Sequence, residues 1–282
     1  MKPVIDVSNL YKTIDDFELG PFNLSIEPGL VTAIVGNNGA GKSTLLKMLM
    51  NLVKPNQGDI RLLERNISED ESWKQHVAYL PQRLLGYDPF NGHQLKEIIS
   101  NLYPNWDESR FNKMVDMFNV NLSKKYGKMS QGMQQKLALA LMLPRNPDIM
   151  ILDEPTSHMD IPSKYLLMDI LVEWMEEGHR TLILASHQTE EIRKLADTIA
   201  IIRDGDIIGH YEKDELSRYF TQYWLADSLP HKTLPGEVKR KGERIVITNQ
   251  ERELEAYLKR HQLKWSQKEH IDLNDAISLM LI

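Results

Sequence analysis

A stretch near the N-terminus combines three glycines with a lysine and two hydroxyl side chains: Gly36, Asn37, Asn38, Gly39, Ala40, Gly41, Lys42, Ser43 and Thr44. Glycines let backbone N–H groups approach an anion closely, a lysine reaches the outer phosphates of a nucleotide, and a hydroxyl can bind Mg²⁺. The spacing G-x-x-x-x-G-K-[ST] therefore predicts a loop that binds a nucleoside triphosphate.

The segments on either side of this loop are those that such a loop requires. Residues 30–35 form an apolar, β-branched run, which predicts a buried strand. Leucine and methionine recur at helical spacing from Leu45 to Leu52, which predicts a helix. A chance glycine turn between a strand and a helix is the alternative, and the Lys42-Ser43 pair in this context argues against it.

An acidic pair follows a second apolar strand. Residues 149–152 are apolar and lead directly into Asp153 and Glu154. A carboxylate at the end of a buried strand beside a phosphate loop is where a nucleotide-bound Mg²⁺ needs a ligand, so Asp153 is predicted to hold the metal, through water. The adjacent Glu154 would then lie near the γ-phosphate and accept a proton from the attacking water as a general base. Two exposed acids that open a turn are the alternative.

Four further motifs follow along the chain: Tyr79–Gln82, Met129–Lys136, Ser157–Asp160 and His187. They resemble the glutamine loop, the signature motif, the D-loop and the switch histidine of the ATP-binding subunit of an ATP-binding-cassette (ABC) transporter. With the phosphate loop and the acidic pair, the resemblance covers residues 4 to about 210. A lone glutamine in a turn or a lone histidine at a strand end is usually structural or exposed, so the shared order of the motifs carries the identification.

The resemblance implies an ATPase that uses ATP and Mg²⁺, and it implies roles for individual residues. Metal binding is implied for Ser43, Gln82 and Asp153. Catalysis is implied for Glu154 as the base, for His187 as the group that holds the γ-phosphate, and for Gln82, which would contact the metal and the water and sense the membrane partner.

Further contacts with ATP are implied for residues outside the phosphate loop. Tyr11 lies where the family places an aromatic that stacks on adenine, and a packed strand aromatic is the alternative. Ser130 and Gly132 would bind a γ-phosphate at a helix N-terminus. In this family the signature faces the phosphate loop of another subunit, so the chain is expected to pair with a second ATP-binding subunit. A homodimer and a heterodimer are both open.

The signature departs from the usual Leu-Ser-Gly-Gly-Gln at Gln131 and Met133. The form Ser-x-Gly-Met-x-Gln-Lys, together with Tyr103–Asp107, is similar to the bacterial exporters that resemble the bacitracin-resistance transporter. This implies a subunit that powers export of peptides, antimicrobials or lipids through a separately encoded transmembrane permease. The family docks its membrane subunit on the helical segment 92–128. His158-Met159 also departs from the small, apolar residues usual in the D-loop.

Composition limits the other classes of function. The net charge is −6 with a pI near 5.9, so no nucleic-acid partner is expected. The absence of cysteine excludes disulfides and thiolate metal sites. The N-terminus shows no signal region, and no apolar run approaches the roughly 20 residues that span a bilayer. We therefore expect a cytoplasmic protein, peripheral on the inner face of the cell membrane through the permease.

The order of elements predicts an α/β fold, and the resemblance implies that it is of the P-loop NTPase cassette type. Strands and helices alternate after residue 148, which predicts a parallel core sheet. An antiparallel β-subdomain is expected before the phosphate loop, and a helical subdomain at about 84–145. Turn residues at 228–236 predict a linker. The cassette is therefore expected at 1–225 and a small α/β appendage at 237–282.

Two other functions compete with the exporter interpretation. One is a soluble ABC ATPase that acts on ribosomes, DNA or assembly, although ribosomal members carry two cassettes per chain and chromosomal members insert long coiled coils. The other is a regulatory protein with a degenerate cassette, against which the retained Lys42, Asp153, Glu154 and His187 argue.

Overall fold

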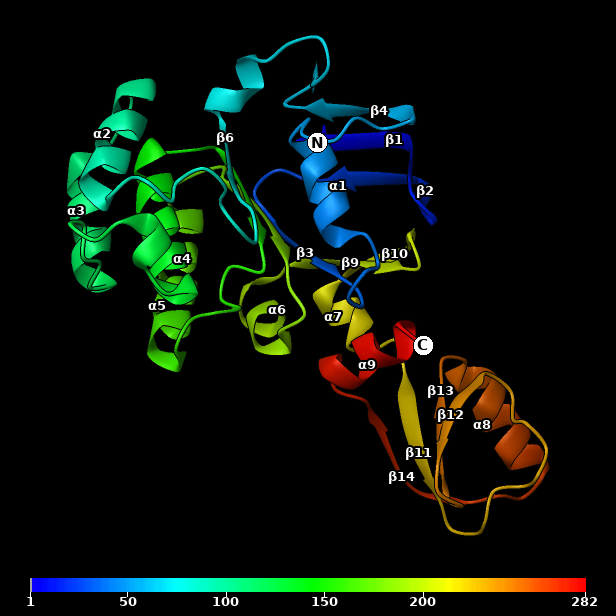
Figure 1. The fold of residues 1–282 in the computed structure, drawn as a ribbon. Helices are drawn as coiled ribbons and strands as arrows, with labels where there is room; N and C mark the ends of the chain where they lie inside the picture. Colours follow the sequence, from blue (N-terminus) through cyan, green and yellow to red (C-terminus); the bar gives the residue numbers. More distant parts are fainter. Residues whose placement is uncertain (1) are drawn as a thin grey trace. The chain divides into compact units, whose positions relative to one another are not determined.

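The computed structural model describes residues 2–282, which form two compact units, one ending at Gly209 and one running from His210 to Ile282 (Figure 1). Each unit has its own sheet structure and its own buried apolar core. All the motifs from Gly36 to His187 lie in the first unit. The candidate functional residues therefore belong to the first unit.

A six-stranded sheet forms the centre of the first unit. Its strands are β3 (Val31–Val35), β6 (Val77–Leu80), β7 (Ile149–Asp153), β8 (Thr181–Ala185), β9 (Thr198–Arg203) and β10 (Asp206–Glu212). They lie in the order β10-β9-β3-β8-β7-β6, and the four pairs from β9 to β6 are parallel. Every residue of β3, β7 and β8 is buried, as expected of central strands in a sheet that is covered on both faces.

A helix follows each of the three central strands. The helices are α1 (Lys42–Leu49) after β3, α5 (Ile161–Glu176) after β7 and α6 (Thr189–Leu195) after β8. Because β3, β8 and β7 are parallel neighbours, their carboxyl ends meet at one edge of the sheet. The phosphate loop, the acidic pair and the histidine loop are therefore brought together by topology.

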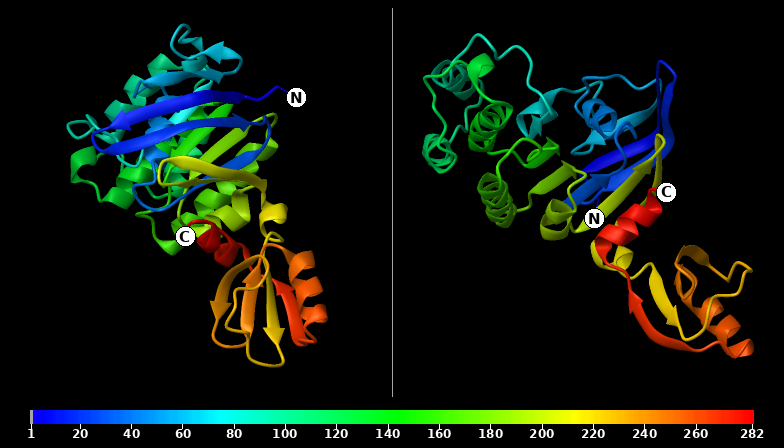
Figure 2. Two further views of the ribbon diagram at one scale, coloured as in Figure 1. Left: turned by 90° about the vertical axis from the view of Figure 1, so that its right-hand side faces the viewer. Right: turned by 60° about the horizontal axis from the view of Figure 1, so that its bottom comes forward.

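An antiparallel sheet is formed by two strands before the phosphate loop and two strands after it in the sequence. Its strands are β1 (Ile5–Ile14), β2 (Phe17–Ile26), β4 (Gln57–Leu62) and β5 (Arg65–Asn66). They lie in the order β2-β1-β4-β5, and Figure 2 shows β1 and β2 side by side. The expected antiparallel subdomain is present, and it continues into β4 and β5 after the loop.

Three helices form the helical part of the first unit, within the segment 84–145. They are α2 (Gly92–Leu102), α3 (Glu108–Met117) and α4 (Gln131–Met142). Each begins at a side-chain cap: Asn91 accepts from the Gln94 N–H, Asp107 from the Arg110 N–H, and Ser130 from the Met133 N–H. Phe111, Leu137 and Trp174 belong to the apolar cluster that packs these helices against the core.

The second unit is a small α/β structure. Its strands are β11 (Thr221–Leu225), β12 (Glu237–Lys241), β13 (Ile245–Thr248) and β14 (Trp265–His270), in the order β12-β13-β11-β14. Its helices are α7 (Lys213–Leu216), α8 (Glu251–Arg260) and α9 (Leu273–Met280). All three pairs of neighbouring strands in this sheet are antiparallel.

The division between the units lies earlier than the sequence suggests. The strand β11 pairs with β13 and β14, so it belongs to the second sheet and not to a cassette ending at residue 225. The segment 228–236 is not a linker between units, because Leu229 and Leu234 are buried in the core of the second unit beside Tyr223. Turn-forming residues mark loops inside a domain as well as linkers between domains, and composition alone does not separate the two.

Candidate active site

The predicted phosphate loop connects the carboxyl end of β3 to the start of α1. Gly41 precedes the helix with φ 107°, a conformation that residues with a side chain rarely adopt. A Cβ atom there would also lie 2.4 Å from Leu19 Cδ1. The first N–H groups of any helix have no acceptor within the helix, so the start of α1 offers donors to an anion at the end of this loop.

Lys42 is a buried cation at the base of the loop. Its side chain is 7% exposed, and Nζ donates hydrogen bonds to the carbonyl oxygens of Gly36 at 2.8 Å and Asn37 at 3.2 Å. Burial lowers the pKa of the ammonium group, while the negative charges of Glu154 and Asp153 oppose that shift. The ammonium group is thus placed between the loop and the two carboxylates.

Asp153 ends β7 beside Ala185 of β8, and it is 1% exposed. Burial raises the pKa of its carboxyl group, and a hydrogen bond with the Ser43 side chain opposes that shift. Among the described residues, Oδ1 of Asp153 has no hydrogen-bond partner. A buried carboxylate oxygen without a partner, next to a hydroxyl, is a pair of oxygen ligands of the kind that Mg²⁺ prefers.

Glu154 has a left-handed backbone, with φ 52°, directly after the strand. Its N–H donates to the Ala185 carbonyl at 2.9 Å, and its own carbonyl accepts from Nε2 of the buried Gln135 at 2.9 Å. Oε2 of Glu154 lies 2.8 Å from Nδ1 of His187. The Glu154 side chain is buried, whereas that of His187 is 58% exposed, so the histidine connects a buried carboxylate to the surface.

Gln82 is placed differently from the residues around Lys42. It is exposed and borders a cavity of about 430 Å³ together with Gln131, Gln134 and His158. This cavity lies between the glutamine loop and the start of α4. The structure thus brings Lys42, the acidic pair and the histidine together, and it places Gln82 beside the signature helix.

Ser130 caps the N-terminus of α4, where its hydroxyl oxygen accepts from the Met133 N–H at 3.3 Å. A hydroxyl that accepts a hydrogen bond still has its own proton to donate. The first backbone N–H groups of α4 are also donors without acceptors inside the helix. Ser130 and the start of α4 together form an anion-binding end of the kind expected for a signature motif.

Comparison with known proteins identifies the family of this site. Residues 19–157 match the ABC transporter family. An uncharacterized ABC transporter ATP-binding protein of Methanocaldococcus jannaschii is 31% identical over 257 residues, covering 87% of this chain and 94% of that relative. The chain belongs to the ABC transporter family. The identification made from the order of the motifs is confirmed, and so is the predicted class of ABC-type ATPase.

One further relative and one solved structure are similar to this ABC protein. The bacitracin transport ATP-binding protein BcrA of Enterococcus faecalis is 26% identical over 234 residues, covering 80% of this chain and 76% of BcrA. A dimeric ATP-binding cassette solved in a post-hydrolysis state with ADP and Pi matches with a TM-score of 0.65 at 21% identity, over 74% of this chain and 98% of that chain. The predicted cassette fold is therefore confirmed.

Gly132 packs the signature helix of this cassette against the D-loop. A Cβ atom on Gly132 would lie 2.4 Å from the carbonyl oxygen of His158, and both contacting groups are backbone. We expect Gly132→Ala to separate the two segments, to lower the free energy of unfolding by about 1–3 kcal/mol and to lower ATPase activity at least about tenfold. Thermal unfolding and a phosphate-release assay measure the two effects.

The matched control for Gly132→Ala is Lys128→Ala. Lys128 is exposed and lies just before the motif, so its loss should leave stability and activity unchanged. A Gly132→Ala variant as stable and as active as the control contradicts the close packing described for this contact.

Two aromatic residues are candidates for contact with adenine in this family. Tyr11 lies on β1 opposite Gln57, and its hydroxyl accepts a hydrogen bond from Thr13 Oγ1 at 3.1 Å. Phe17 opens β2, and its Cζ lies 3.3 Å from where a Cβ on Gly41 would be, so it reaches the phosphate loop. Phe17 is not among the residues expected from the sequence, because only the folded sheet brings it to the loop. Stacking by Tyr11 stays a prediction.

Sequence analysis also missed buried polar residues that surround Glu154 in the cassette. Gln135 donates to the Glu154 carbonyl, and Glu191 on α6 is 2% exposed and accepts from the Thr156 hydroxyl. Gln135 belongs to the signature motif, and Glu191 follows shortly after His187, in the first turn of α6. Their positions beside recognised motifs are therefore the feature of the sequence that could have indicated these two residues.

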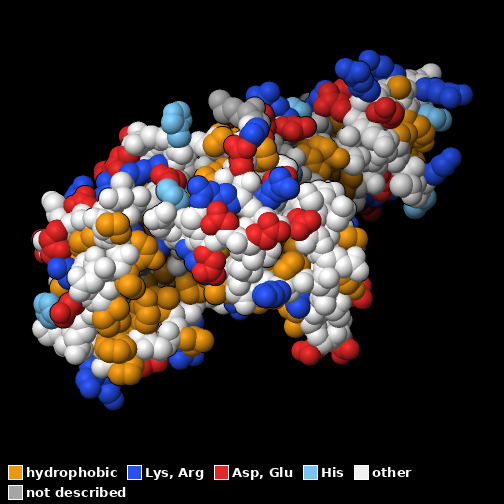
Figure 3. All heavy atoms as spheres, turned by 90° about the horizontal axis from the view of Figure 1, so that it is seen from above, with side chains coloured by type: hydrophobic (Ala, Val, Ile, Leu, Met, Phe, Trp, Pro, Cys, Tyr) orange, Lys and Arg blue, Asp and Glu red, His pale blue; other side chains and the backbone are white. Residues whose placement is uncertain are grey.

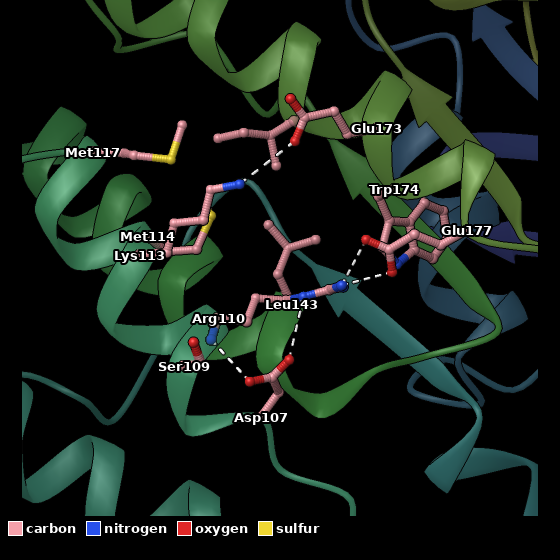
Figure 4. A pocket seen from close by; sticks show the side chains of 11 residues that line it. Asp107, Ser109, Arg110, Lys113, Met114, Met117, Leu143, Glu173, Trp174 and Glu177 are labelled. Carbon is pink, nitrogen blue, oxygen red and sulfur yellow. Dashed lines mark hydrogen bonds and ion pairs between the residues drawn. The ribbon is translucent and has the colours of Figure 1, made fainter.

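A separate cavity lies between α3 and α5, and Figure 4 shows the side chains that line it. Arg110 pairs with Glu177 at 2.6 Å, and Lys113 pairs with Glu173 at 3.7 Å. These charges are matched to one another, and Met114 lies beside them. None of the predicted site residues lines this cavity, so it is separate from the nucleotide motifs.

Proposed function

We propose that this chain binds and hydrolyses ATP to power a membrane exporter of peptides, antimicrobials or lipids. The observation that carries the proposal is the buried group formed by Lys42, Asp153 and Glu154, with His187 in contact with Glu154. One edge of the sheet then carries a cation for phosphate, an oxygen ligand for a metal and a general base. Phosphoryl transfer to water requires these three kinds of group.

Each residue of the site has a separate role in the proposed hydrolysis. Lys42 and the N–H groups of the loop bind the phosphates. Glu154 takes the proton from the attacking water, and His187 orients Glu154 and reaches the γ-phosphate from its exposed position. Removing a proton from water as it attacks is the step that Glu154 contributes.

The site fits Mg²⁺ as the resident metal. Ser43 and Oδ1 of Asp153 would supply the hydroxyl and carboxylate oxygens, with Gln82 as a further candidate. Few protein ligands are needed, because Mg²⁺ keeps several waters and takes oxygens from the phosphates. When bound, Mg²⁺ neutralises charge on the phosphates.

The chain would act as a dimer of cassettes. It has one phosphate loop and one signature motif. Ser130, Gly132 and the start of α4 would bind the γ-phosphate held by the other subunit, so ATP favours the closed dimer and hydrolysis releases it. The fold match to a cassette solved as a dimer with ADP and Pi supports this arrangement.

The membrane partner would dock on the helical part of the first unit. A groove there is lined by Leu84, Ile99, Leu102 and Met142, and Figure 3 shows hydrophobic side chains gathered over this end of the chain. Leu102 is 69% exposed at the rim. A short amphipathic helix of a transmembrane permease matches such a groove, because its apolar face would cover the exposed Leu102.

We expect Leu102→Asp to uncouple the permease without stopping the ATPase. A charge in the groove should weaken binding of the permease by at least about tenfold, while ATP hydrolysis by the isolated chain stays within about twofold. Leu52→Asp is the matched control, because Leu52 is 65% exposed and does not line the groove. Equal permease binding by both variants, in co-purification, contradicts this docking site.

The direction of transport and the class of substrate rest on similarity to BcrA, a bacitracin transport protein. The described residues contain no helix long and apolar enough to cross a membrane, and the permease would hold the chain at the cytoplasmic face. Substrate-stimulated ATPase activity of the co-purified complex tests the proposal. Stimulation by bacitracin-like peptides or lipids supports it, whereas full activity that no permease or substrate changes favours an ATPase that is not coupled to transport.

A further inference from the structure

A second buried carboxyl group lies close to the candidate base. Glu191, on α6, is 2% exposed, and neither ATP binding nor the chemistry proposed above uses it. Its Oε1 accepts a hydrogen bond from the hydroxyl of Thr156, two residues after Glu154. A buried carboxyl group costs free energy, so a group kept in this place calls for a role.

Thr156 and Gln188 connect Glu191 to the neighbouring elements. Nε2 of Gln188 donates to Thr156 Oγ1 at 2.9 Å, and Oε1 of Gln188 accepts from Lys164 Nζ at 2.6 Å. The Gln188 N–H donates to Ser186 Oγ at 3.0 Å. The network therefore joins the loop after β7, the loop after β8 and the helix α5.

These two loops carry the groups that act on water and phosphate. Glu154 begins the first loop, and His187 follows Ser186 in the second. Oε2 of Glu154 and Nδ1 of His187 lie 2.8 Å apart. The hydrogen bond from Thr156 to Glu191 connects the two loops a second time, because α6 directly continues the second loop.

Burial raises the pKa of Glu191 to about 7. The charge of Glu154 acts in the same direction, while a hydrogen bond with Ser186 and the charges of Lys164 and His187 oppose it. A neutral carboxylic acid places no second negative charge beside Glu154 and a bound triphosphate. An ionised one adds repulsion where the transition state of phosphoryl transfer is already negative.

We propose that Glu191 is a positioning residue for hydrolysis, which as a neutral acid holds Thr156 and thereby keeps Glu154 aligned with His187. This inference rests on the proposed ATPase function. It assigns Glu191 no contact with substrate, so its loss should alter the chemical step and spare nucleotide binding. Misplacement of catalytic groups by about 1 Å can cost about 10²-fold in rate.

The experiment compares Glu191→Ala with Glu191→Gln in the full chain. Alanine removes the acceptor of the Thr156 hydroxyl, so kcat should fall about 10- to 100-fold while the Kd for a fluorescent ATP analogue changes less than about threefold. Glutamine keeps a neutral acceptor of the same size, so kcat at pH 7 should stay within about threefold of wild type. Glu190→Gln, an exposed change on the same helix, is the matched control and should have no effect.

The pH profile gives a readout that a purely structural role would not move. In the wild type, kcat should fall as the pH rises and Glu191 ionises, with a midpoint above 7 because bound triphosphate raises the pKa further. Glu191→Gln has no proton to lose, so this fall should be absent. A fall that persists unchanged in Glu191→Gln overturns the assignment of a neutral acid.

A double-mutant cycle tests whether Glu191 acts through Thr156. Thr156→Val should lower kcat as Glu191→Ala does, and the double variant should be no slower than the slower single variant. Additive losses, or an unchanged kcat in folded Glu191→Ala, overturn the proposal. If Glu191→Ala does not fold, the kcat of Thr156→Val and the pH profile of Glu191→Gln test the proposal instead. A wild-type chain without ATPase activity refutes the proposed function instead, so the two failures are distinguishable.

Discussion

Replacing Glu154 by glutamine is expected to lower kcat for ATP hydrolysis by about 10²- to 10⁴-fold, with ATP still bound. The amide has the size of the carboxylate but cannot accept the proton of the attacking water. Lys42 and the phosphate loop are unchanged, so nucleotide binding should persist. Because ATP then stays intact between the cassettes, the variant should elute as a stable dimer from a sizing column when ATP is present.

The comparison for Glu154→Gln is Glu176→Gln, an exposed change at the end of α5. It removes the same charge from the chain and should leave both turnover and elution as in the wild type. Full ATPase activity in Glu154→Gln would refute the assignment of the base. Loss of ATP binding would show that the Glu154 carboxylate contributes to binding of ATP itself and not only to the transition state of hydrolysis.

Replacing Lys42 by alanine should weaken ATP binding by about 10- to 100-fold, the value of charge-assisted hydrogen bonds to phosphate. The change also removes a structural contact, because Nζ donates hydrogen bonds to the carbonyl oxygens of Gly36 and Asn37 within the loop. The change further removes a positive charge that interacts with the carboxylates of Glu154 and Asp153. Titration with a fluorescent ATP analogue measures the effect.

Lys54→Ala is the control for Lys42→Ala, because Lys54 is exposed and carries the same charge. It should bind ATP as the wild type does. An unchanged Kd in Lys42→Ala would mean that the phosphates bind elsewhere, and the assignment of the loop would fail with it.

The parts of the site that sequence analysis predicted are those that local pattern determines. The loop at Gly36–Thr44 and the pair Asp153-Glu154 each follow an apolar strand, and parallel neighbouring strands bring such loops to one edge. Both could be predicted from the sequence, because the residue types and their spacing within a short segment indicate the chemistry.

The parts that were missed depend on pairing between distant segments. The strand β11 pairs with β13 and β14, which follow it by many residues, so the expected boundary at residue 225 lies too late and the first unit ends at Gly209. Phe17 reaches Gly41 only across the folded sheet. In the sequence, Glu191 is one of several charged residues in a predicted helix. Its burial and its hydrogen bond from Thr156 distinguish it from the exposed Glu190 of that helix.

Mixing two defective chains tests the central claim, that an ATPase site forms between two cassettes. Ser130→Glu damages the signature and Lys42→Ala the phosphate loop, so each variant alone should be nearly inactive. In a 1:1 mixture of a homodimeric protein, half the dimers are mixed and each has one intact site, so activity should recover to about a quarter of wild type. No recovery, when pull-down of a tagged chain shows that mixed dimers form, would contradict a site shared between subunits.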